Sequence, residues 1–471
     1  MSAFATIPML TLPEVARMAE GDLVVREVPS SPVEREALLR SGVDGVSIDT
    51  RTLAAGQLFV PLRGGRADGH RFLAEAFKRG AALALCERGA YPEWEGREPG
   101  PLVLVDDATA ALQRLARRFR DGWSGLLIGV SGSAGKTTTK DLVAAVLAAG
   151  APTLKTEGNL NNHWGVPLTL LRLRPEHRSA VVEIAMNHAG EIGLLAAIAR
   201  PEAAIITNAG SAHLEGLGSL EAIAREKASL AAAVPEGRPV FAGADSPRLM
   251  SALRGMKVRL IGYGFAPHAA VRPDTVTDLG PEGTRFTVAG FPPVHLRLIG
   301  RHQVQNALAA LAVAREYAIS PAAAVAAIEA QRPGRGRMEA RTLAGATLLV
   351  DCYNANPDST RAALATLAAW PGARHRIAVL GDMLELGPDA ARLHREVGEA
   401  VRDAELWTVG RHAADYVSGA ERAGAPARAF PDKPAVAAAL REVLAPETVV
   451  LFKASRGAAL EDVVALLEAG A

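Results

Sequence analysis

The chain has 471 residues, of which 49% are hydrophobic and 22% are charged, and its formal net charge is +1. This length predicts about three domains, and the small net charge excludes an overall field that would recruit nucleic acid or an anionic membrane. The two cysteines, Cys86 and Cys352, lie far apart, which excludes a disulfide scaffold or a cysteine-zinc site and is typical of a reducing cytosol. No apolar stretch approaches the ~20 residues needed to cross a bilayer. We therefore expect a cytoplasmic protein without nucleic acid partners or membrane insertion.

The first part of the chain mixes short strands with helices. Periodicity and composition predict three strands, two helices and one loop here: strands over 46–49, 57–62 and 82–86, helices over 70–79 and 109–120, and a loop over 89–101. We expect these elements to form a small mixed α/β domain over residues 1–121.

A glycine-rich turn from Gly132 to Thr137 follows the apolar run 126–130 and leads into a helix near Thr138. Backbone N–H groups of such a turn can close around phosphate oxygens. Lys136 would supply a positive charge to the β- and γ-phosphates, and the hydroxyl of Thr137 suits Mg²⁺. Strand, turn and helix follow in the order that a nucleotide-binding loop requires, which argues against a chance glycine turn. The turn therefore predicts ATP binding.

Strands and helices then alternate, which predicts a parallel sheet with ligands at the carboxyl ends of its strands. The predicted elements are strands over 179–184 and 203–207, helices over 191–199, 219–233, 301–316 and 321–330, and a few antiparallel strands within 271–298. Together they indicate a central P-loop ATPase domain over residues 122–331.

The stretch 332–337 is too rich in glycine and proline for a helix or strand, and it predicts a joint between domains. Beyond it, strands centred on Leu348, Ala378, Trp407 and Val450 alternate with helices. This pattern predicts a third, Rossmann-like domain over residues 332–471, and an α/β fold of three domains overall.

Three residues after the phosphate loop have side chains suited to its chemistry. Glu183 ends an apolar strand, where a carboxylate would face the γ-phosphate and its metal. His213 lies in the loop after the next strand, and its position fits a structural loop residue as well as a metal ligand. Lys227, taken alone, is an ordinary solvated lysine on a helix.

Motifs spread over the whole chain resemble those of the Mur ligases of peptidoglycan synthesis. They are Asp49-Thr50-Arg51, Asp68-Gly69-His70, Gly132-Ser133-Ala134-Gly135-Lys136-Thr137-Thr138, the stretch 156–162, Glu183-Ile184-Ala185-Met186-Asn187, the stretch 301–307, the stretch 353–359 and the stretch 381–387. The last two are most similar to the member that adds D-alanyl-D-alanine to a UDP-N-acetylmuramoyl-tripeptide.

The resemblance implies roles for individual residues. It implies that ATP contacts Gly132, Ser133, Ala134, Gly135, Lys136, Thr137, Thr138, Asn306 (against the adenine), Arg337 and Asp351. Two Mg²⁺ ions would be held by Thr137, Glu183, His213 and a carbamylated Lys227, and the catalytic set would be Lys136, Glu183, His213 and Lys227. Substrate-binding residues would be Asp49, Thr50, Arg51, Asn159, Asn162, Tyr353, Asn354, Asn356, Lys453, Ser455 and Arg456.

The resemblance also implies an activity, and the sequence favours it over four alternatives. The tripeptide carboxylate would take the γ-phosphate of ATP, and the dipeptide amine would then displace phosphate, in a monomeric enzyme. The sister ligase that adds the third residue usually carries Asp-Asn-Pro-Arg, which this chain lacks, and folylpolyglutamate synthase needs no N-terminal UDP-binding domain. A GTPase would need an Asn-Lys-x-Asp element, and a non-catalytic nucleotide-binding subunit would leave Glu183, His213 and Lys227 without a common task. The third residue of the tripeptide stays open.

Overall fold

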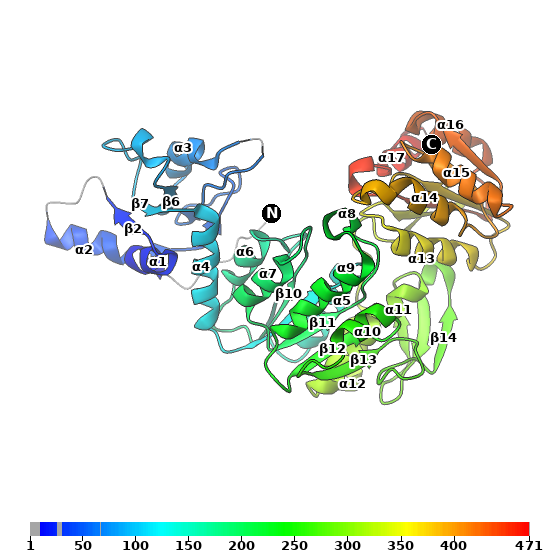
Figure 1. Ribbon diagram of the computed structural model, residues 1–471, viewed down its shortest axis with the longest axis horizontal. Helices are drawn as coiled ribbons and strands as arrows, with labels where there is room; N and C mark the ends of the chain where they lie inside the picture. The colour runs from blue at the N-terminus through cyan, green and yellow to red at the C-terminus, as the bar shows by residue number, and fades with distance from the viewer. Residues whose placement is uncertain (1–9, 26–30, 66, 471) are drawn as a thin grey trace. The chain divides into compact units, whose positions relative to one another are not determined.

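The computed structural model describes residues 10–25, 31–65 and 67–470. By its internal contacts the chain divides into two compact units. Figure 1 shows the chain coloured by residue number. The first unit consists of Met1–Gly129, Ala151–Ala185 and Gly193–Glu202, and the second of Val130–Gly150, Met186–Ile192 and Ala203–Ala471.

The N-terminal part of the first unit is built on a five-stranded sheet. Its order is β2 (Asp22–Val24), β7 (Leu102–Val105), β6 (Leu83–Glu87), β5 (Leu58–Phe59) and β4 (Val46–Ser47), and a separate pair joins β1 (Leu10–Thr11) to β3 (Gly42–Val43). The helices here are α1 (Leu12–Ala19), α2 (Pro32–Arg40), α3 (Leu73–Lys78) and α4 (Ala108–Asp121). The core contains Phe59, Leu73 and Cys86.

The predicted strands and helices of this region are confirmed, although two of the three strands are shorter than expected. β5 stops at Phe59 rather than at residue 62, and the nearby Pro61 has no N–H for a sheet ladder. β4 stops at Ser47, since the Ser47 hydroxyl accepts from the backbone N–H of Asp49 and turns the chain. The helix expected over 70–79 begins as a 3₁₀ turn, Gly69–Phe72, and the expected loop 89–101 contains another, Tyr91–Glu93.

The central sheet has six strands. Its order is β13 (Arg259–Tyr263), β12 (Pro239–Gly243), β11 (Ala203–Ile206), β8 (Leu126–Ser131), β10 (Ser179–Glu183) and β9 (Thr153–Lys155). The pairs β13/β12, β12/β11 and β10/β9 are parallel, as predicted. β14 (Thr275–Asp278), β15 (Thr284–Thr287) and β16 (Val294–Leu296) form the predicted antiparallel sheet.

Five of the helices that accompany these sheets lie close to their predicted positions, whereas the short helices over 165–170, 214–217 and 247–253 were not predicted. The helices are α5 (Lys136–Ala148), α6 (Gly165–Leu170), α7 (Glu191–Ala199), α8 (Leu214–Leu217), α9 (Leu220–Ala232), α10 (Pro247–Leu253), α11 (Arg301–Glu316) and α12 (Pro321–Glu329). The helices predicted over 191–199 and 301–316 match α7 and α11 at both ends. Among the described residues no helix is long and apolar enough to cross a membrane.

The C-terminal region of the second unit carries another six-stranded sheet. Its order is β17 (Glu339–Leu343), β18 (Ala346–Asp351), β22 (Thr448–Lys453), β19 (His375–Leu380), β20 (Glu405–Val409) and β21 (Ala427–Phe430). Only the β17/β18 pair is antiparallel in this sheet, so the predicted Rossmann-like arrangement is confirmed. All four predicted strand centres lie in its parallel strands.

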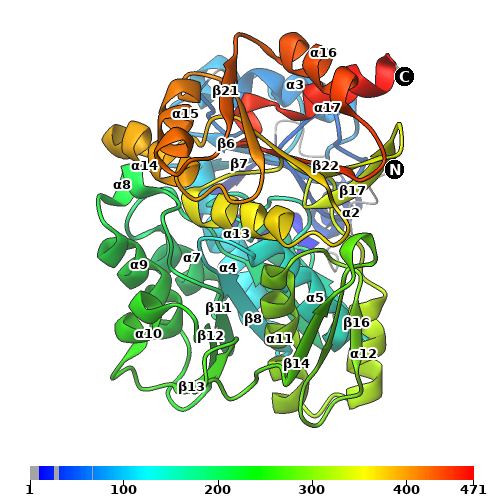
Figure 2. The ribbon, with the colours of Figure 1, turned by 90° about the vertical axis from the view of Figure 1, so that its right-hand side faces the viewer.

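Helices cover this sheet in the second unit. They are α13 (Pro357–Ala368), α14 (Ala390–Gly398), α15 (Ala413–Arg422), α16 (Lys433–Val443) and α17 (Glu461–Ala469). α16 and α17 share a core with the sheet that contains Trp407 and Phe452, and α13 contacts β19 and β22. Figure 2 shows α13 next to α11, and the two helices are in contact. Both helices belong to the second unit, which also contains the phosphate loop.

Candidate functional site

The phosphate loop joins β8 to α5 in the conformation that the sequence predicts. α5 begins at Lys136, and Gly135 precedes it with φ of 78°, in the left-handed region that favours glycine. Gly132 has φ of 145°, and a Cβ there would lie 1.9 Å from the hydroxyl oxygen of Thr207. Both glycines are therefore required by the backbone and by close packing. The turn presents the N-terminus of a 13-residue helix, which attracts anions.

A neighbouring strand end braces this loop. Asn208 Oδ1 accepts from the backbone N–H of Ser133 at 3.1 Å and of Ala134 at 2.9 Å, and its Nδ2 donates to the Ala134 carbonyl at 3.1 Å. The hydroxyl of Thr207 donates to the same carbonyl at 2.6 Å. Residues Thr207 and Asn208 were not among the predicted site residues. Their position directly after a strand of the predicted parallel sheet was the available signal.

Two cationic residues lie at the loop in the second unit. Lys136 Nζ donates to the Gly132 carbonyl at 2.8 Å. Arg337 Nη2 donates to the hydroxyl of Thr137 at 3.1 Å, and its guanidinium lies 3.8 Å from the ring centre of Tyr353. The structure thus brings Arg337 to the phosphate loop across 200 positions of sequence. Positive charge beside a helix N-terminus suits a triphosphate.

Asn306 is buried against the start of α5. Its Oδ1 accepts from the hydroxyl of Thr139 at 3.2 Å, and its Nδ2 donates to Gln303 at 2.8 Å. A Cβ on Gly135 would lie 2.5 Å from Asn306 Oδ1. The structure therefore gives Asn306 a role in shaping the loop, while its contact with adenine stays a prediction. Thr138 lies in the first turn of α5.

The two predicted substrate motifs of the C-terminal region meet in space. Lys453, at the end of β22, forms a 2.6 Å ion pair with Asp351 at the end of β18, and it also donates to the Asn354 carbonyl at 3.1 Å. The hydroxyl of Ser455 donates to the Ala355 carbonyl at 3.1 Å. Arg456 lies 5.5 Å from the ring centre of Tyr353. The carboxyl ends of parallel strands hold these groups together.

His213 is held by a carboxylate that the sequence did not indicate as a site residue. Its Nδ1 lies 2.8 Å from Glu385 Oε2, and its backbone φ is 61°. The hydrogen bond from His213 lowers the pKa of the Glu385 carboxyl below its usual value. Because Nδ1–H of His213 donates to the Glu385 carboxylate, Nε2 is left to act as a hydrogen-bond acceptor or a metal ligand.

Lys227 is fully buried in α9, which corrects the interpretation as a solvated lysine that its sequence context alone suggested. Burial of a charged ammonium is costly, so lysines rarely occupy such positions. The adjacent Glu226 accepts from the backbone N–H groups of Gly190 and Ile192 at 2.9 and 3.0 Å. These bonds tie α9 to the start of α7.

Glu183, in the first unit, combines one bonded and one unbonded carboxylate oxygen. Oε1 accepts from Asn161 Nδ2 at 2.8 Å, whereas the buried Oε2 has no hydrogen-bond partner among the described residues. The backbone N–H of Glu183 donates to Thr156, which orients the end of β10. Of the asparagines in this stretch, the structure brings Asn161 to Glu183. Asn162 instead accepts from the backbone N–H of Gly165 at 2.9 Å, just before α6, and Asn159 is exposed.

The predicted N-terminal substrate motif forms a local, exposed cluster in the first unit. Arg51 Nη2 pairs with Asp49 Oδ2 at 2.6 Å, and this bond lowers the pKa of the Asp49 carboxyl. Thr50 lies between them. Asp68 and His70, from the second motif, bond at 2.6 Å, and His70 Nε2 accepts from the Glu87 backbone at 3.0 Å. The first motif can contact a ligand, whereas the second fixes the end of β6.

These groups fit a nucleotide and a divalent cation. In the second unit, the N-terminus of α5 lies with Lys136 and Arg337, which suits the phosphates of a nucleotide. In the first unit, Glu183 has a buried carboxylate oxygen with no hydrogen-bond partner among the described residues, which suits a divalent cation. Among the described residues no group of three or more His, Cys, Asp and Glu side chains could hold a metal by itself. A Mg²⁺ ion commonly keeps water and phosphate ligands and needs only one or two carboxylates, so such a group is not required.

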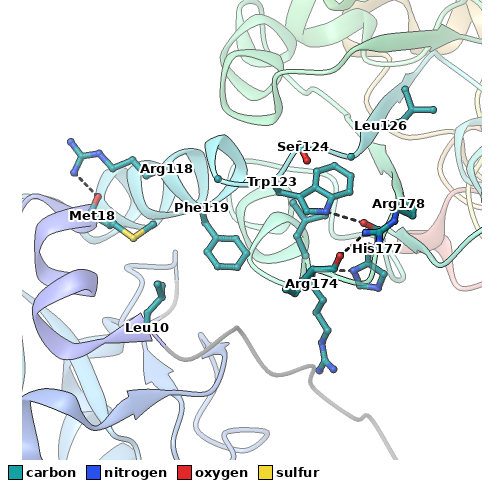
Figure 3. Close-up of a pocket in the computed structure, with 14 residues that line it drawn as sticks. Leu10, Met18, Arg118, Phe119, Trp123, Ser124, Leu126, Arg174, His177 and Arg178 are labelled. Carbon is teal, nitrogen blue, oxygen red and sulfur yellow. Dashed lines mark hydrogen bonds between the residues drawn. The ribbon is translucent and has the colours of Figure 1, made fainter.

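A cavity of about 740 Å³ lies elsewhere in the first unit (Figure 3). It lies at the end of α4, where Trp123 Nε1 donates to the His177 carbonyl at 3.1 Å. Phe119, Arg174 and Arg178 also line it, and none of the predicted site residues does. The cavity is therefore separate from the predicted residues.

Comparisons with known proteins find similarity over most of the chain. Family models described as Mur ligase catalytic domain, Mur ligase middle domain and Mur ligase glutamate ligase domain match residues 42–120, 130–314 and 336–456. The UDP-N-acetylmuramoyl-tripeptide–D-alanyl-D-alanine ligase of Bacillus subtilis (strain 168) is 35% identical, over 96% of this chain and 97% of that protein. The Escherichia coli (strain K12) ligase of the same name is 37% identical, over 90% of this chain and 94% of its own.

Solved structures show the same similarity. The crystal structure of MurF from Acinetobacter baumannii has a TM-score of 0.86 at 28% identity and covers 98% of this chain and 99% of its own. MurF ligase from Thermotoga maritima, in complex with ADP, has a TM-score of 0.78 at 27% identity and covers 90% of this chain and 97% of its own. With a three-domain α/β fold, a P-loop and family matches across each domain, this chain belongs to the Mur ligase family.

Proposed function

We propose that this chain is an ATP-dependent ligase that adds D-alanyl-D-alanine to UDP-N-acetylmuramoyl-tripeptide, in cytoplasmic peptidoglycan precursor synthesis. The observation that carries the proposal is the phosphate loop, with its required glycines, in a chain similar over nearly its full length to ligases of that name. A carboxylate oxygen of the tripeptide attacks the γ-phosphorus, and ADP leaves. The dipeptide amine then attacks the acyl carbon, phosphate leaves, and the nitrogen loses a proton.

The residues of the chain support this reaction by charge and position. Lys136 and Arg337 are proposed to neutralise phosphate oxygens, which is supported by their contacts with Gly132 and Thr137 and by the field of the α5 N-terminus. Thr138, Ser133, Ala134 and the glycines line the same turn. In the C-terminal region, Asp351 is proposed to contact ATP, and the residues proposed to face the substrates are Tyr353, Asn354, Asn356, Lys453, Ser455 and Arg456. The UDP-tripeptide is proposed to be bound by Asp49, Thr50, Arg51, Asn159 and Asn162. A site that excludes water would protect the acyl phosphate from hydrolysis.

Two Mg²⁺ ions would neutralise the phosphate charge when bound. Thr137, Glu183, His213 and a carbamylated Lys227 are proposed to hold them. Carbamylation converts a cation into an anion, which suits both the burial of Lys227 and a metal. Incubation with ¹³C-bicarbonate should give a carbamate signal in the carbon NMR spectrum that is absent from Lys227→Ala. Equal spectra for the two proteins would exclude the modification.

We also propose domains over 1–121, 122–331 and 332–471, and a monomer. The family matches at 42–120, 130–314 and 336–456 each fall within one of these ranges, which supports the boundaries. Light scattering on the purified chain should give the molar mass of one copy, and a mass of two copies would contradict the monomer.

Phosphate release tests the proposed reaction. With ATP, magnesium and UDP-N-acetylmuramoyl-tripeptide, turnover should require D-alanyl-D-alanine. Lys136→Ala should lower turnover about 100-fold or more, because a charge aimed at the transferring phosphoryl group is lost. Binding of the UDP-tripeptide should persist in this variant. Turnover with a single diamino acid or with glutamate as acceptor would favour the sister ligase or a folylpolyglutamate synthase, and full activity of Lys136→Ala would refute the loop assignment.

A further inference from the structure

Residues 207–213, which we call the connecting segment, follow β11 and contact two separate parts of the second unit. On one side they contact the phosphate loop, through Thr207 and Asn208 and through Gly210, whose N–H donates to the Ser133 hydroxyl at 2.9 Å. The Ser133 hydroxyl in turn donates to the Gly210 carbonyl at 3.0 Å. Ser133 and Ala134 are thus held mainly by this segment.

On the other side the connecting segment contacts the C-terminal region. Asp358, in the first turn of α13, accepts through Oδ2 from the backbone N–H of Ser211 at 2.7 Å and from its hydroxyl at 2.9 Å. Glu385 makes the second contact, to His213. Asn356 caps α13 by accepting from Ser359, so the position of Asp358 is set by an ordered helix end.

The contact between Asp358 and the connecting segment has no spare room. A Cβ on Gly210 would lie 2.1 Å from Asp358 Oδ2 and 3.0 Å from its Cγ. Gly210 is not among the glycines with positive φ, so its backbone conformation is open to any residue. The absence of a side chain at position 210 therefore serves the approach of this carboxylate.

We propose that Asp358 is a positioning residue for nucleotide binding. By holding Ser211 it fixes the connecting segment, and Asn208 then holds the Ser133 and Ala134 amides in the conformation that receives phosphate. The C-terminal region thereby contributes to nucleotide affinity through a residue that does not touch the nucleotide. The inference rests on the proposed function, since it requires a nucleotide at the phosphate loop.

Calorimetry with Mg-ADP and the full chain, in the absence of dipeptide, tests this role. Asp358→Ala should weaken ADP binding about fivefold, because two hydrogen bonds to a half-exposed charge are lost. Asp358→Asn should restore most of the affinity, since its amide oxygen can accept the same two bonds. Asp389→Ala is the matched control: Asp389 pairs with Arg392 three residues later, as Asp358 does with Arg361, on a neighbouring helix end. This control should bind ADP like the unmodified chain.

A double-mutant cycle separates the proposed contact from general destabilisation. Gly210→Ala should weaken ADP binding by displacing the carboxylate, and the Gly210→Ala/Asp358→Ala double variant should bind about as well as Asp358→Ala alone. Additive losses, or unchanged ADP affinity in Asp358→Ala, would overturn the inference. A variant that raised only the KM for the dipeptide would assign Asp358 to substrate binding and also overturn it. If the unmodified chain bound no ADP, the proposed function itself would fail.

Discussion

Two predicted ligand-binding regions of this molecule are organised in opposite ways. In the Asp49–Arg51 motif the charged partners lie two positions apart, and the Arg51 side chain is 84% exposed. At the phosphate loop the contacts come from far along the chain: Asn208 from more than 70 positions away and Arg337 from 200. The first region holds its shape by itself, whereas the second is assembled by the fold.

The difference has energetic consequences. Exposed ion pairs contribute little to stability, so the N-terminal motif is free to exchange its internal bond for a ligand. The phosphate loop is packed so closely that single methyl groups have no room, at Gly132 against Thr207 and at Gly135 against Asn306. We therefore expect substitutions at the loop to act through the structure, and substitutions at Arg51 to act only through contact with a ligand.

The largest effect is expected from Gly132→Ala. Its Cβ would overlap the Thr207 hydroxyl, and the positive φ adds backbone strain. Together these should weaken ATP binding about 100-fold, which calorimetry with an ATP analogue would measure. Gly190→Ala is a suitable control, because Gly190 also has positive φ but nothing lies within 4 Å of its Cβ position. Equal nucleotide affinity in the two variants would show that the close contact between position 132 and Thr207 does not affect nucleotide binding.

An intermediate effect is expected at His394, which is fully buried in the C-terminal region. Its Nε2 accepts from the backbone N–H of Met383 at 2.9 Å, and its Nδ1 donates to the Ala390 carbonyl at 2.6 Å, so the bonds require neutral imidazole. Burial lowers the pKa of His394 below its ordinary value of 6.5, and the ring of His412, stacked at 4.3 Å, acts in the same direction. Asp382 and Asp415 oppose the shift.

The sign of the pH effect follows from this lowered pKa. Below pH 6.5 the unfolded chain takes up a proton at His394 that the folded chain does not, so this residue destabilises the fold as the pH falls from 6.5 toward its folded pKa. His394→Gln can still accept from Met383 but cannot titrate. Urea midpoints at about pH 7.5 and about pH 5.5 should therefore differ less in the variant than in the unmodified chain. The same pH difference in both proteins would contradict the prediction.

The smallest effect on the fold is expected from Arg51→Ala. Because the pair with Asp49 is exposed and local, the urea midpoint should not change measurably. Affinity for the UDP-tripeptide, measured by calorimetry, should nevertheless fall if the motif binds this substrate as predicted. Arg374→Ala offers a control, since Arg374 is also an exposed arginine paired with a glutamate, Glu447, at 3.0 Å. A lower urea midpoint in Arg51→Ala with unchanged substrate affinity would show that Arg51 acts through the structure and not through a ligand, which would contradict the prediction.

Much of the fold was predictable from the sequence because its signals are local. α7 and α11 match their predicted ends, and strand, glycine turn and helix at the phosphate loop follow from neighbouring residues. Asp358 and Glu385 were contained in recognised stretches but were not assigned to the site, and Asn208 lay outside these stretches. Their importance arises from partners far away in sequence, and no local pattern indicates which loop side chains will meet.

The main alternation of strands and helices and the family could be predicted from the sequence alone, since periodicity, glycine placement and motif spacing are properties of neighbouring residues. Three features could be seen only in the folded chain: Lys227 is buried, Asn161 rather than Asn162 bonds Glu183, and Asp358 reaches Ser211. Burial and side-chain partners depend on how distant segments pack. That packing is a property of the whole chain, and one stretch of sequence does not contain it.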